Sequence, residues 1–249
     1  MLSEQKIQNI INDSQAGAWL IDKPEDWTSH DVIAKLRGLS KIKAIGHTGT
    51  LDPFATGLLI CLTGKATKLV DYFHDFPKTY LAEIKLGCVS DTYDRTGKIE
   101  NKNIDLEITE DKIKKTLMTF LGKQQQLPPM FSAKKIDGRK LYQLARQGQE
   151  VERQPSQIEI FKIDPVSFKA DEQLLTLRIV CSTGTYIRSL TNDLGQKLGL
   201  GAVLWQLRRE NIGPFSVTEA IPLAQANQEL LLKKMILSKK ILAILPQLC

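Results

Sequence analysis

Cysteine and histidine are scarce in this chain. Its 249 residues include four cysteines and three histidines. The cysteines form no C-x-x-C pair and have no histidine at a metal-binding spacing, which argues against a zinc site and against a redox dithiol. Two of them lie in apolar runs, as expected of buried thiols in a reducing cytosol. The four are Cys61, Cys88, Cys181 and Cys249.

Long apolar runs are also missing. No segment approaches the length of a membrane span. The polar residues 1–17 lack the basic-then-apolar order of a signal peptide. We therefore expect a cytoplasmic protein with no membrane partner.

The charge balance is only moderately basic. Lysine and arginine number 34 against 28 acidic residues, a net charge of +6, and 42% of residues are hydrophobic. Such a composition is ordinary for a globular protein, and the length allows one large domain or two small ones. The basic excess permits a polyanionic partner such as nucleic acid, but charge alone does not identify one.

Strand-like and helix-like patterns are mixed along the chain without strict β-α-β alternation. This order favours an α+β sheet with helices on its outside. Residues 124–156 show the least regular pattern, with a basic stretch and a helix expected near 140–146. Strands are expected at 18–21, 58–62, 80–86, 158–163, 174–181 and 202–209, and helices at 29–39, 66–73, 109–121, 186–198 and in the tail from 222.

The segment from Gly46 to Gly57 is the most informative part of the sequence. It reads G-H-T-G-T-L-D-P-F-A-T-G, with one carboxylate, Asp52, and an imidazole, His47, five positions earlier. Several glycines and a proline make such a loop stiff and turn-rich. Loops on a rigid scaffold are where catalytic groups collect. We predict that Asp52 is the reacting group, although an acid that only caps a turn would also fit this spacing.

Two apparent nucleotide-binding motifs fail on inspection. The Thr63–Ala66 stretch hints at a P-loop, but Leu59 stands where that motif needs glycine and Ala66 where it needs serine or threonine. The stretch from Gly46 to Gly49 lacks the G-x-G-x-x-G spacing of a dinucleotide site.

Further segments share the unusual chemistry of the Asp52 loop. They are Asp22-Lys23-Pro24, Lys78-Thr79-Tyr80, residues 127–134, residues 140–148, residues 184–190 and Leu207-Arg208-Arg209. With the loop G-H-T-G-T-L-D-P-x-A-x-G-L-L, they make the chain resemble the TruB family of bacterial tRNA pseudouridine-55 synthases. The resemblance covers roughly residues 18–215.

This resemblance implies a fold and a reaction. The expected fold is a mixed, mostly antiparallel sheet flanked by helices, the pseudouridine-synthase fold. The expected reaction is the isomerisation of uridine to pseudouridine in the T-loop of tRNA, without metal or cofactor. The nucleotide must be flipped out of its stack first, because the target is otherwise hidden.

The resemblance also implies roles for single residues. Asp52 matches the essential aspartate, Tyr80 the ring that stacks on the target uracil, and Arg188 the arginine paired with that aspartate. Three further residues match substrate-binding positions: His47 helps hold the opened T-loop, and Tyr186 and Leu207 line the base pocket. Lys23 is expected among the substrate-binding residues as well.

The domain organisation is predicted from the same match. Residues 1–17 are expected to be an N-terminal extension, 18–215 the catalytic domain, and 216–249 a short helical tail. Within the domain, 124–153 matches a mobile insertion that contacts RNA. Many family members carry a C-terminal PUA-type domain, which we expect to be absent here. We expect a monomer that binds the T-arm stem-loop of tRNA.

Two other functions remain open at this point. One is a guide-RNA-dependent pseudouridine synthase of the related archaeal and eukaryotic kind, which normally needs the PUA-type domain. The other is a non-catalytic RNA-binding or tRNA-folding module on the same scaffold.

Overall fold

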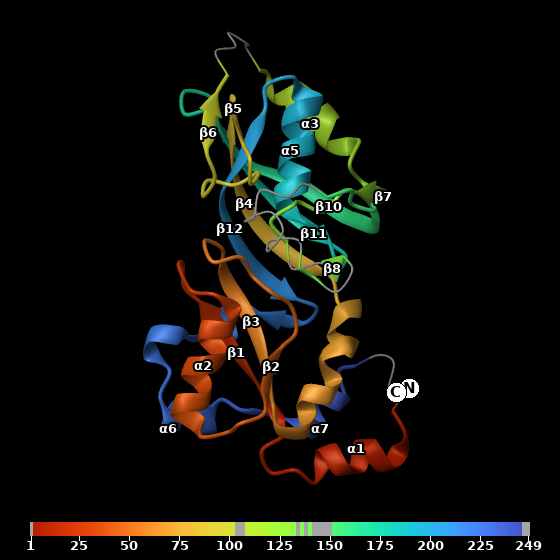
Figure 1. Cartoon of the computed structure of the whole chain (residues 1–249), viewed down its shortest axis with the longest axis vertical. Coiled ribbons are helices and arrows are strands. Elements are labelled where there is room, and N and C mark those ends of the chain that lie inside the picture. Colours follow the sequence, from red (N-terminus) through yellow and green to blue (C-terminus); the bar gives the residue numbers. More distant parts are fainter. Residues whose placement is uncertain (1, 103–107, 133–134, 137–138, 141–150, 246–249) are drawn as a thin grey trace. The chain divides into compact units, whose positions relative to one another are not determined.

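The chain divides into two compact units. The structure is a computed structural model that describes residues 2–102, 108–132, 135–136, 139–140 and 151–245. The first unit comprises Met1–Lys78 and Arg208–Cys249, and the second comprises Thr79–Leu207. The predicted boundaries at 17/18 and 215/216 do not coincide with this division, and they stay a prediction. Figure 1 gives the element labels used below.

The first unit is built on a short mixed sheet. Its central pair is β1 (Gly17–Lys23) and β3 (Thr56–Thr63), which run antiparallel with Trp19 opposite Cys61. Strand β14 (Ile221–Pro222) lies parallel to β1. Strand β15 (Ile236–Leu237) pairs antiparallel with β1, and β2 (Ile45–His47) pairs antiparallel with β3. Strand β13 (Phe215–Ser216) pairs with the end of β12 (Ala202–Ile212).

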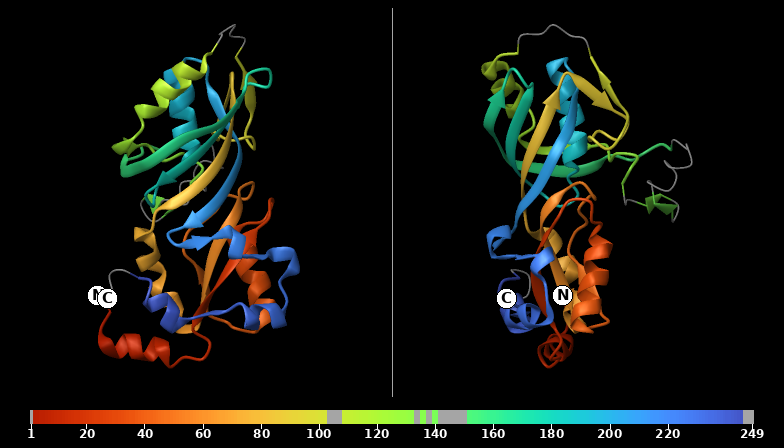
Figure 2. Two further views of the ribbon diagram at one scale, coloured as in Figure 1. Left: turned by 180° about the vertical axis from the view of Figure 1, so that it is seen from behind. Right: turned by 90° about the vertical axis from the view of Figure 1, so that its left-hand side faces the viewer.

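Both faces of this sheet are buried, which explains the continuous apolar runs 18–21 in β1 and 58–62 in β3. Alternate residues point to opposite faces, so Leu20 and Ile60 join one core cluster while Trp19 and Cys61 join the other. The first cluster is covered by α1 (Glu4–Ile11), the 3₁₀ helix η1 (Gly64–Asp75) and α7 (Ser238–Leu242). The second is covered by α2 (Ser29–Ser40) and α6 (Gln228–Lys233), and Figure 2 shows α2 beside these strands.

Helix α2 begins where its sequence predicts. The Thr28 hydroxyl accepts the Asp31 N–H, and the Asp31 carboxylate accepts the Thr28 N–H, so the two residues form a capping box. Val32, Ile33 and Leu36 form the buried stripe. This helix turns the chain directly after β1 and returns it toward β2.

The second unit is a larger, mainly antiparallel sheet. Its strand order is β4-β11-β10-β7, and β12 lies on the other side of β4. Alternation is clearest in β11, where Leu175, Leu177 and Ile179 are buried. The main strands are β4 (Lys78–Leu86), β7 (Gly122–Gln126), β10 (Ser156–Lys169) and β11 (Leu174–Cys181). Two small hairpins are β5 (Cys88–Ser90) with β6 (Ile99–Asn101) and β8 (Lys135–Ile136) with β9 (Arg139–Lys140).

Two helices pack against each other in this second unit. They are α3 (Glu110–Met118) and α5 (Ile187–Leu198), which lie side by side in Figures 1 and 2. Helix α3 is capped by the Thr109 hydroxyl, and α5 ends at Gly199 with a positive φ of 79°. The first unit additionally holds the 3₁₀ turns η2 (Val217–Glu219) and η3 (Leu223–Gln225).

The architecture confirms the predicted α+β, mostly antiparallel fold, with several local differences. Residues 66–73 lie in a 3₁₀ helix rather than an α-helix, and β10 continues six residues past the predicted end at Ile163. Gln124–Gln126 form part of β7, although this region was expected to be irregular. The helix predicted near 140–146 falls almost entirely outside the described residues. Within the described part of the chain, no helix is long and apolar enough to cross a membrane.

Candidate active site

The Asp52 loop lies in the first unit between β2 and β3. The Thr48 N–H donates to the Ile60 carbonyl at 3.1 Å, which extends the pairing of β2 and β3 into the loop. The Ala55 N–H then donates to the Asp52 carbonyl at 3.1 Å and closes a turn around the acid. Asp52 itself is partly exposed. The carboxylate is therefore carried by a turn that opens directly from the sheet.

Both chain neighbours of Asp52 are held by residues that follow β1, namely Asp26 in the β1–α2 connection and Ser29 at the start of α2. The Leu51 N–H donates to the Ser29 hydroxyl at 3.0 Å, and the Ser29 hydroxyl donates to the Leu51 carbonyl at 3.3 Å. On the other side, the Asp26 N–H donates to the Pro53 carbonyl at 2.9 Å. The main chain of the acid is thus fixed on both sides by a segment more than 20 residues earlier.

Lys23 reinforces the same connection from inside. Its side chain is fully buried, with a relative exposure of 0%. The ammonium donates to the carbonyls of Pro24 at 2.8 Å, Trp27 at 2.6 Å and Pro53 at 3.0 Å. All three ammonium hydrogens are satisfied, as burial of a charge requires. This geometry favours a role in holding the Asp52 loop over contact with a substrate.

The charge of Lys23 is nevertheless sensitive to its surroundings. Burial lowers the pKa of Lys23 to about 8, and the Asp52 and Asp26 carboxylates act in the opposite direction by favouring the ammonium. The Asp52 carboxylate and the Lys23 ammonium therefore interact electrostatically, in addition to the bond through the Pro53 carbonyl.

Arg209 holds the two ends of the loop together. It is 2% exposed, its Nε donates to the Leu58 carbonyl at 2.8 Å, and its Nη2 donates to the Gly49 carbonyl at 3.0 Å. At Gly57 the chain has a φ of 104°, and a Cβ there would lie 2.3 Å from the Arg209 carbonyl oxygen. Only glycine allows this approach of β3 to β12.

His47 lies on β2 at the entrance to the same loop. Burial, with smaller contributions from His30 and Arg209, lowers the pKa of His47 to about 4, so the ring is neutral near pH 7. The His47 and His30 rings meet edge to face with centroids 6.0 Å apart. The Nδ1 atom of His47 is buried and has no hydrogen-bond partner among the residues that the structure describes.

Arg188 is a buried cation in the second unit. It lies in the first turn of α5 with 4% exposure. Its Nη1 donates to the Thr92 carbonyl at 3.3 Å, and its Nη2 donates to the Phe131 carbonyl at 2.8 Å. The same Nη1 lies 3.5 Å from Oδ2 of Asp94. The guanidinium therefore connects α5 to the loop after β5 and to the segment after β7.

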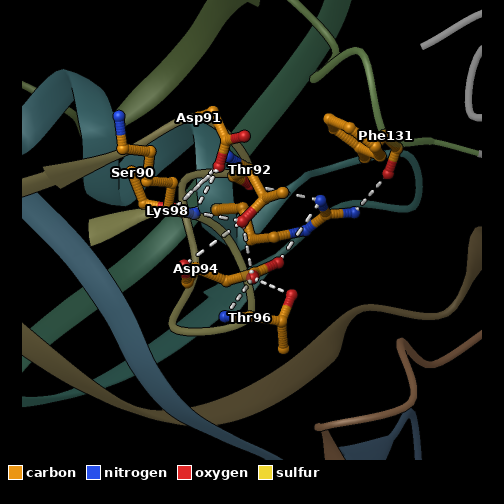
Figure 3. A network of polar contacts seen from close by, with 8 residues as sticks. Ser90, Asp91, Thr92, Asp94, Thr96, Lys98 and Phe131 are labelled. Carbon is orange, nitrogen blue, oxygen red and sulfur yellow. Dashed lines mark hydrogen bonds and ion pairs between the residues drawn. The ribbon is translucent and has the colours of Figure 1, made fainter. Parts of the chain in front are cut away.

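Asp94 is itself oriented by a compact turn. Its Oδ1 accepts the Thr92 hydroxyl at 2.8 Å, the Thr96 N–H at 2.9 Å and the Thr96 hydroxyl at 2.5 Å. Figure 3 shows Thr92 and Thr96 around the Asp94 carboxylate, and these bonds occupy Oδ1. The other oxygen, Oδ2, is left to interact with Arg188. Sequence reasoning did not single out Asp94. The turn-forming pattern D-T-Y-D-R-T-G at 91–97 is the signal that could have indicated it.

The remaining predicted site residues also lie in the second unit. Tyr80 is partly exposed on β4, and Leu207 is buried at the end of the β12 portion in this unit. Tyr186 is the N-cap of α5 and is partly exposed. The side-chain amide of Gln126 forms hydrogen bonds with both the N–H and the carbonyl of Tyr186. Gln126 is another residue that sequence reasoning did not select.

The predicted residues thus form two groups. Lys23, His47 and Asp52 belong to the first unit, whereas Tyr80, Tyr186, Arg188 and Leu207 belong to the second. The structure brings the first three together around one loop and connects Tyr186 with Arg188 at the start of α5. The pairing of Asp52 with Arg188 stays a prediction.

Comparison with known proteins adds an independent line of evidence. The TruB family pseudouridylate synthase (N terminal domain) model matches residues 37–187. That range includes His47, Asp52, Tyr80 and Tyr186, whereas Lys23, Arg188 and Leu207 lie outside it. The proteins called tRNA pseudouridine synthase B from Clostridium kluyveri and Clostridium acetobutylicum are 43% and 47% identical to this chain. The alignments cover 87% and 84% of this chain and 74% and 71% of those proteins.

Solved structures agree on the fold. A chain in the crystal structure of a Cbf5–Nop10–Gar1 complex aligns with a TM-score of 0.66 and 29% identity, covering 88% of this chain and 54% of that one. A chain of the archaeal box H/ACA sRNP Nop10–Cbf5 complex aligns with a TM-score of 0.64 and 25% identity, covering 94% and 62% respectively. The present chain thus spans less than two thirds of either solved chain.

The bonds of Lys23 predict a stability effect. Lys23→Met keeps the length of the side chain but leaves three carbonyls without their donor, so we expect the free energy of unfolding to fall by about 2–4 kcal/mol. Lys43→Met, at an exposed lysine of the same unit, should change it by less than about 0.5 kcal/mol. Urea unfolding followed by circular dichroism measures both. Equal effects of the two substitutions would contradict the role assigned to Lys23.

The neutral state of His47 predicts a pH dependence. Its pKa is about 4 in the folded chain, below the ordinary histidine value of 6.5, so the unfolded state binds more protons between these pH values. The free energy of unfolding should therefore decrease as pH falls from about 6.5 to 4, with at most about 3 kcal/mol due to this residue. In His47→Gln the decrease should be smaller. Urea unfolding at pH 6.5 and 4.5 tests this, and an unchanged pH dependence in the variant would contradict it.

Proposed function

The chain belongs to the TruB family of pseudouridylate synthases, and on that premise we propose that it converts uridine to pseudouridine at position 55 in the T-loop of tRNA. The observation that carries this proposal is the identity of 43–47%, over more than four fifths of the chain, to proteins called tRNA pseudouridine synthase B. We propose a cytoplasmic location, where tRNA is processed, and a monomeric chain.

The proposed reaction sets clear demands on the site. The N1–C1′ bond of uridine breaks, the uracil turns over, and a C5–C1′ bond forms. The C5 hydrogen leaves as a proton and N1 gains one, so the composition of the nucleotide is unchanged. Because the base is stacked within the T-loop, the nucleotide must first be flipped into a pocket, at a cost of a few kcal/mol.

Asp52 is our proposed catalytic residue. A carboxylate can attack C1′ as a nucleophile and leave again, or it can remove the ribose 2′-proton as a base. Either route needs an ionised carboxylate that is held still, and both neighbours of Asp52 are bonded to residues that follow β1. These bonds support a preorganised acid rather than a turn acid at the surface.

Arg188 is proposed as the cation that pairs with Asp52 during the reaction. Burial in a closed site disfavours a carboxylate, and a nearby guanidinium opposes that effect while keeping its own proton. The bonds of Arg188 to the Thr92 and Phe131 carbonyls, together with the Asp94 carboxylate, support a fixed orientation. An exposed helix residue would have none of these constraints.

The other residues are proposed to bind the flipped nucleotide and the opened loop. Tyr80 stacks on the uracil, and Tyr186 and Leu207 line the pocket. His47 contacts the T-loop, and its partly exposed ring, which is neutral near pH 7, supports such a contact. Residues 124–153 are proposed to contact the T-arm, although much of this segment lies outside the described residues.

A guide-RNA-dependent enzyme is the main alternative. The chains in the Cbf5 complexes are 29% and 25% identical, whereas the tRNA pseudouridine synthase B proteins exceed 40%. This difference favours an enzyme that recognises tRNA without a guide. A purely RNA-binding module is disfavoured because Asp52, Tyr80 and Arg188 are all present.

The role of Asp52 is tested with an unmodified tRNA transcript and no guide RNA. We expect Asp52→Asn, which retains the size but not the charge, to lower pseudouridine formation by more than about 1,000-fold. Its tRNA affinity in filter binding should stay close to that of the unaltered chain. Asp71→Asn, at an exposed acid of the same unit, serves as the control and should retain full activity. Formation of pseudouridine by Asp52→Asn at the unaltered rate would refute the assignment.

The role of Tyr80 is tested by a pair of substitutions. Tyr80→Phe keeps the ring and should be the milder change, whereas Tyr80→Ala removes a stacking contact worth about 1–3 kcal/mol. Single-turnover rates on the same transcript measure the difference. Equal losses in both variants would point to the phenol hydroxyl instead of the ring.

A further inference from the structure

Gln126 makes an unusual pair of hydrogen bonds at the end of β7. Its side chain is 3% exposed, and both ends of its amide are used on one residue. Gln126 Nε2 donates to the Tyr186 carbonyl at 3.0 Å, and the Tyr186 N–H donates to Gln126 Oε1 at 2.8 Å. The Gln126 side chain therefore bonds both the N–H and the carbonyl of Tyr186, as the backbone of a neighbouring strand would in a sheet.

Tyr186 needs such a constraint because no regular element sets its main chain. It is the N-cap of α5, with φ −93° and ψ 108°, and its side chain makes no capping bond. Two residues earlier, Gly184 has a positive φ of 83°. The carbonyl of Tyr186 already accepts the Leu190 N–H at 3.1 Å, so Gln126 supplies a second donor to it and the acceptor for its N–H.

The segment after Gln126 repeats this connection to α5. The Ser189 hydroxyl donates to the Leu127 carbonyl at 2.8 Å, and Arg188 Nη2 donates to the Phe131 carbonyl at 2.8 Å. Arg153, which does not belong to α5, donates from Nη1 to the Pro128 carbonyl at 3.0 Å. The carbonyls of residues 127, 128 and 131 are thus all bonded, and two of them face the start of α5.

We propose that Gln126 is a positioning residue for the nucleotide pocket. It holds the main chain of Tyr186 at the start of α5, and the segment that it begins holds Arg188 through Phe131. This inference rests on the proposed function, because it concerns the geometry that a flipped uridine requires. Gln126 does not contact the substrate, and it acts through Tyr186.

Two substitutions separate positioning from simple structural support. Gln126→Met keeps the approximate volume and loses both bonds. Gln126→Glu keeps the acceptor for the Tyr186 N–H, but its ionised carboxylate faces the Tyr186 carbonyl without a donor. When protonated, the same carboxyl can again donate and accept. Burial raises the pKa of such a carboxyl, so this change falls within an accessible pH range. Gln196→Glu, at an exposed glutamine near the other end of α5, is the matched control.

The experiment measures single-turnover pseudouridine formation at saturating unmodified tRNA transcript, from pH 5.5 to 8.5, with tRNA affinity from filter binding. We expect Gln126→Met to lower the rate by about 10- to 100-fold at unchanged affinity, because small misplacements of substrate-positioning groups have effects of this size. The rate of Gln126→Glu relative to the unaltered chain should rise as pH falls. The same ratio for Gln196→Glu should not change with pH.

A pH-independent ratio for Gln126→Glu, or a full rate for a folded Gln126→Met, would overturn the inference. If Gln126→Met does not fold, the pH dependence of Gln126→Glu decides the question alone. The unaltered chain is assayed in parallel at every pH. Its failure to form pseudouridine would overturn the proposed function itself, and this inference with it.

Discussion

Hydrogen bonds from buried cations to main-chain carbonyls are the interactions on which the Asp52 loop depends. A loop lacks the ladder that satisfies backbone groups in a sheet, so its carbonyls need other donors. Lys23 supplies the Pro53 carbonyl, and Arg209 supplies those of Gly49 and Leu58. Because both cations are buried, they are costly unless every donor is used, and the loop must keep the shape that uses them. The position of Asp52 follows from this mutual requirement.

Buried side chains of the second unit are held by main-chain bonds in the same way. Arg188 is held by the carbonyls of Thr92 and Phe131 and faces Asp94, whose other oxygen is occupied by Thr96. The uncharged side-chain amide of Gln126 likewise bonds the main chain of Tyr186. In each case a side chain is oriented by bonds to the main chain of a distant segment. Such constraints keep groups in place without the cost of rearrangement during a reaction.

Elements with buried faces were the most predictable parts of the fold. The observed β11 has the predicted limits 174–181, and α2 begins at the predicted residue 29, because apolar periodicity is a local signal. Strand β7 was missed because its sequence, Gly-Lys-Gln-Gln-Gln, has no apolar alternation, and its strand character comes from pairing with β10. The 3₁₀ form of η1 was equally inaccessible, since its pattern of apolar residues also fits an α-helix.

The family and the α+β class could be identified from the sequence, because the G-H-T-G-T-L-D-P motif and its companions are short, local patterns. The proposed site residues come from the same patterns. Tertiary structure alone decided which side chains hold them. Lys23 bonds the Pro53 carbonyl 30 residues away, Gln126 bonds Tyr186 across 60 residues, and Arg209 bonds Gly49 across 160. Every residue carries the same main-chain carbonyl, so no side-chain pattern identifies the carbonyl that a distant donor will bond. That partner is set only when folding brings donor and carbonyl within about 3 Å of each other.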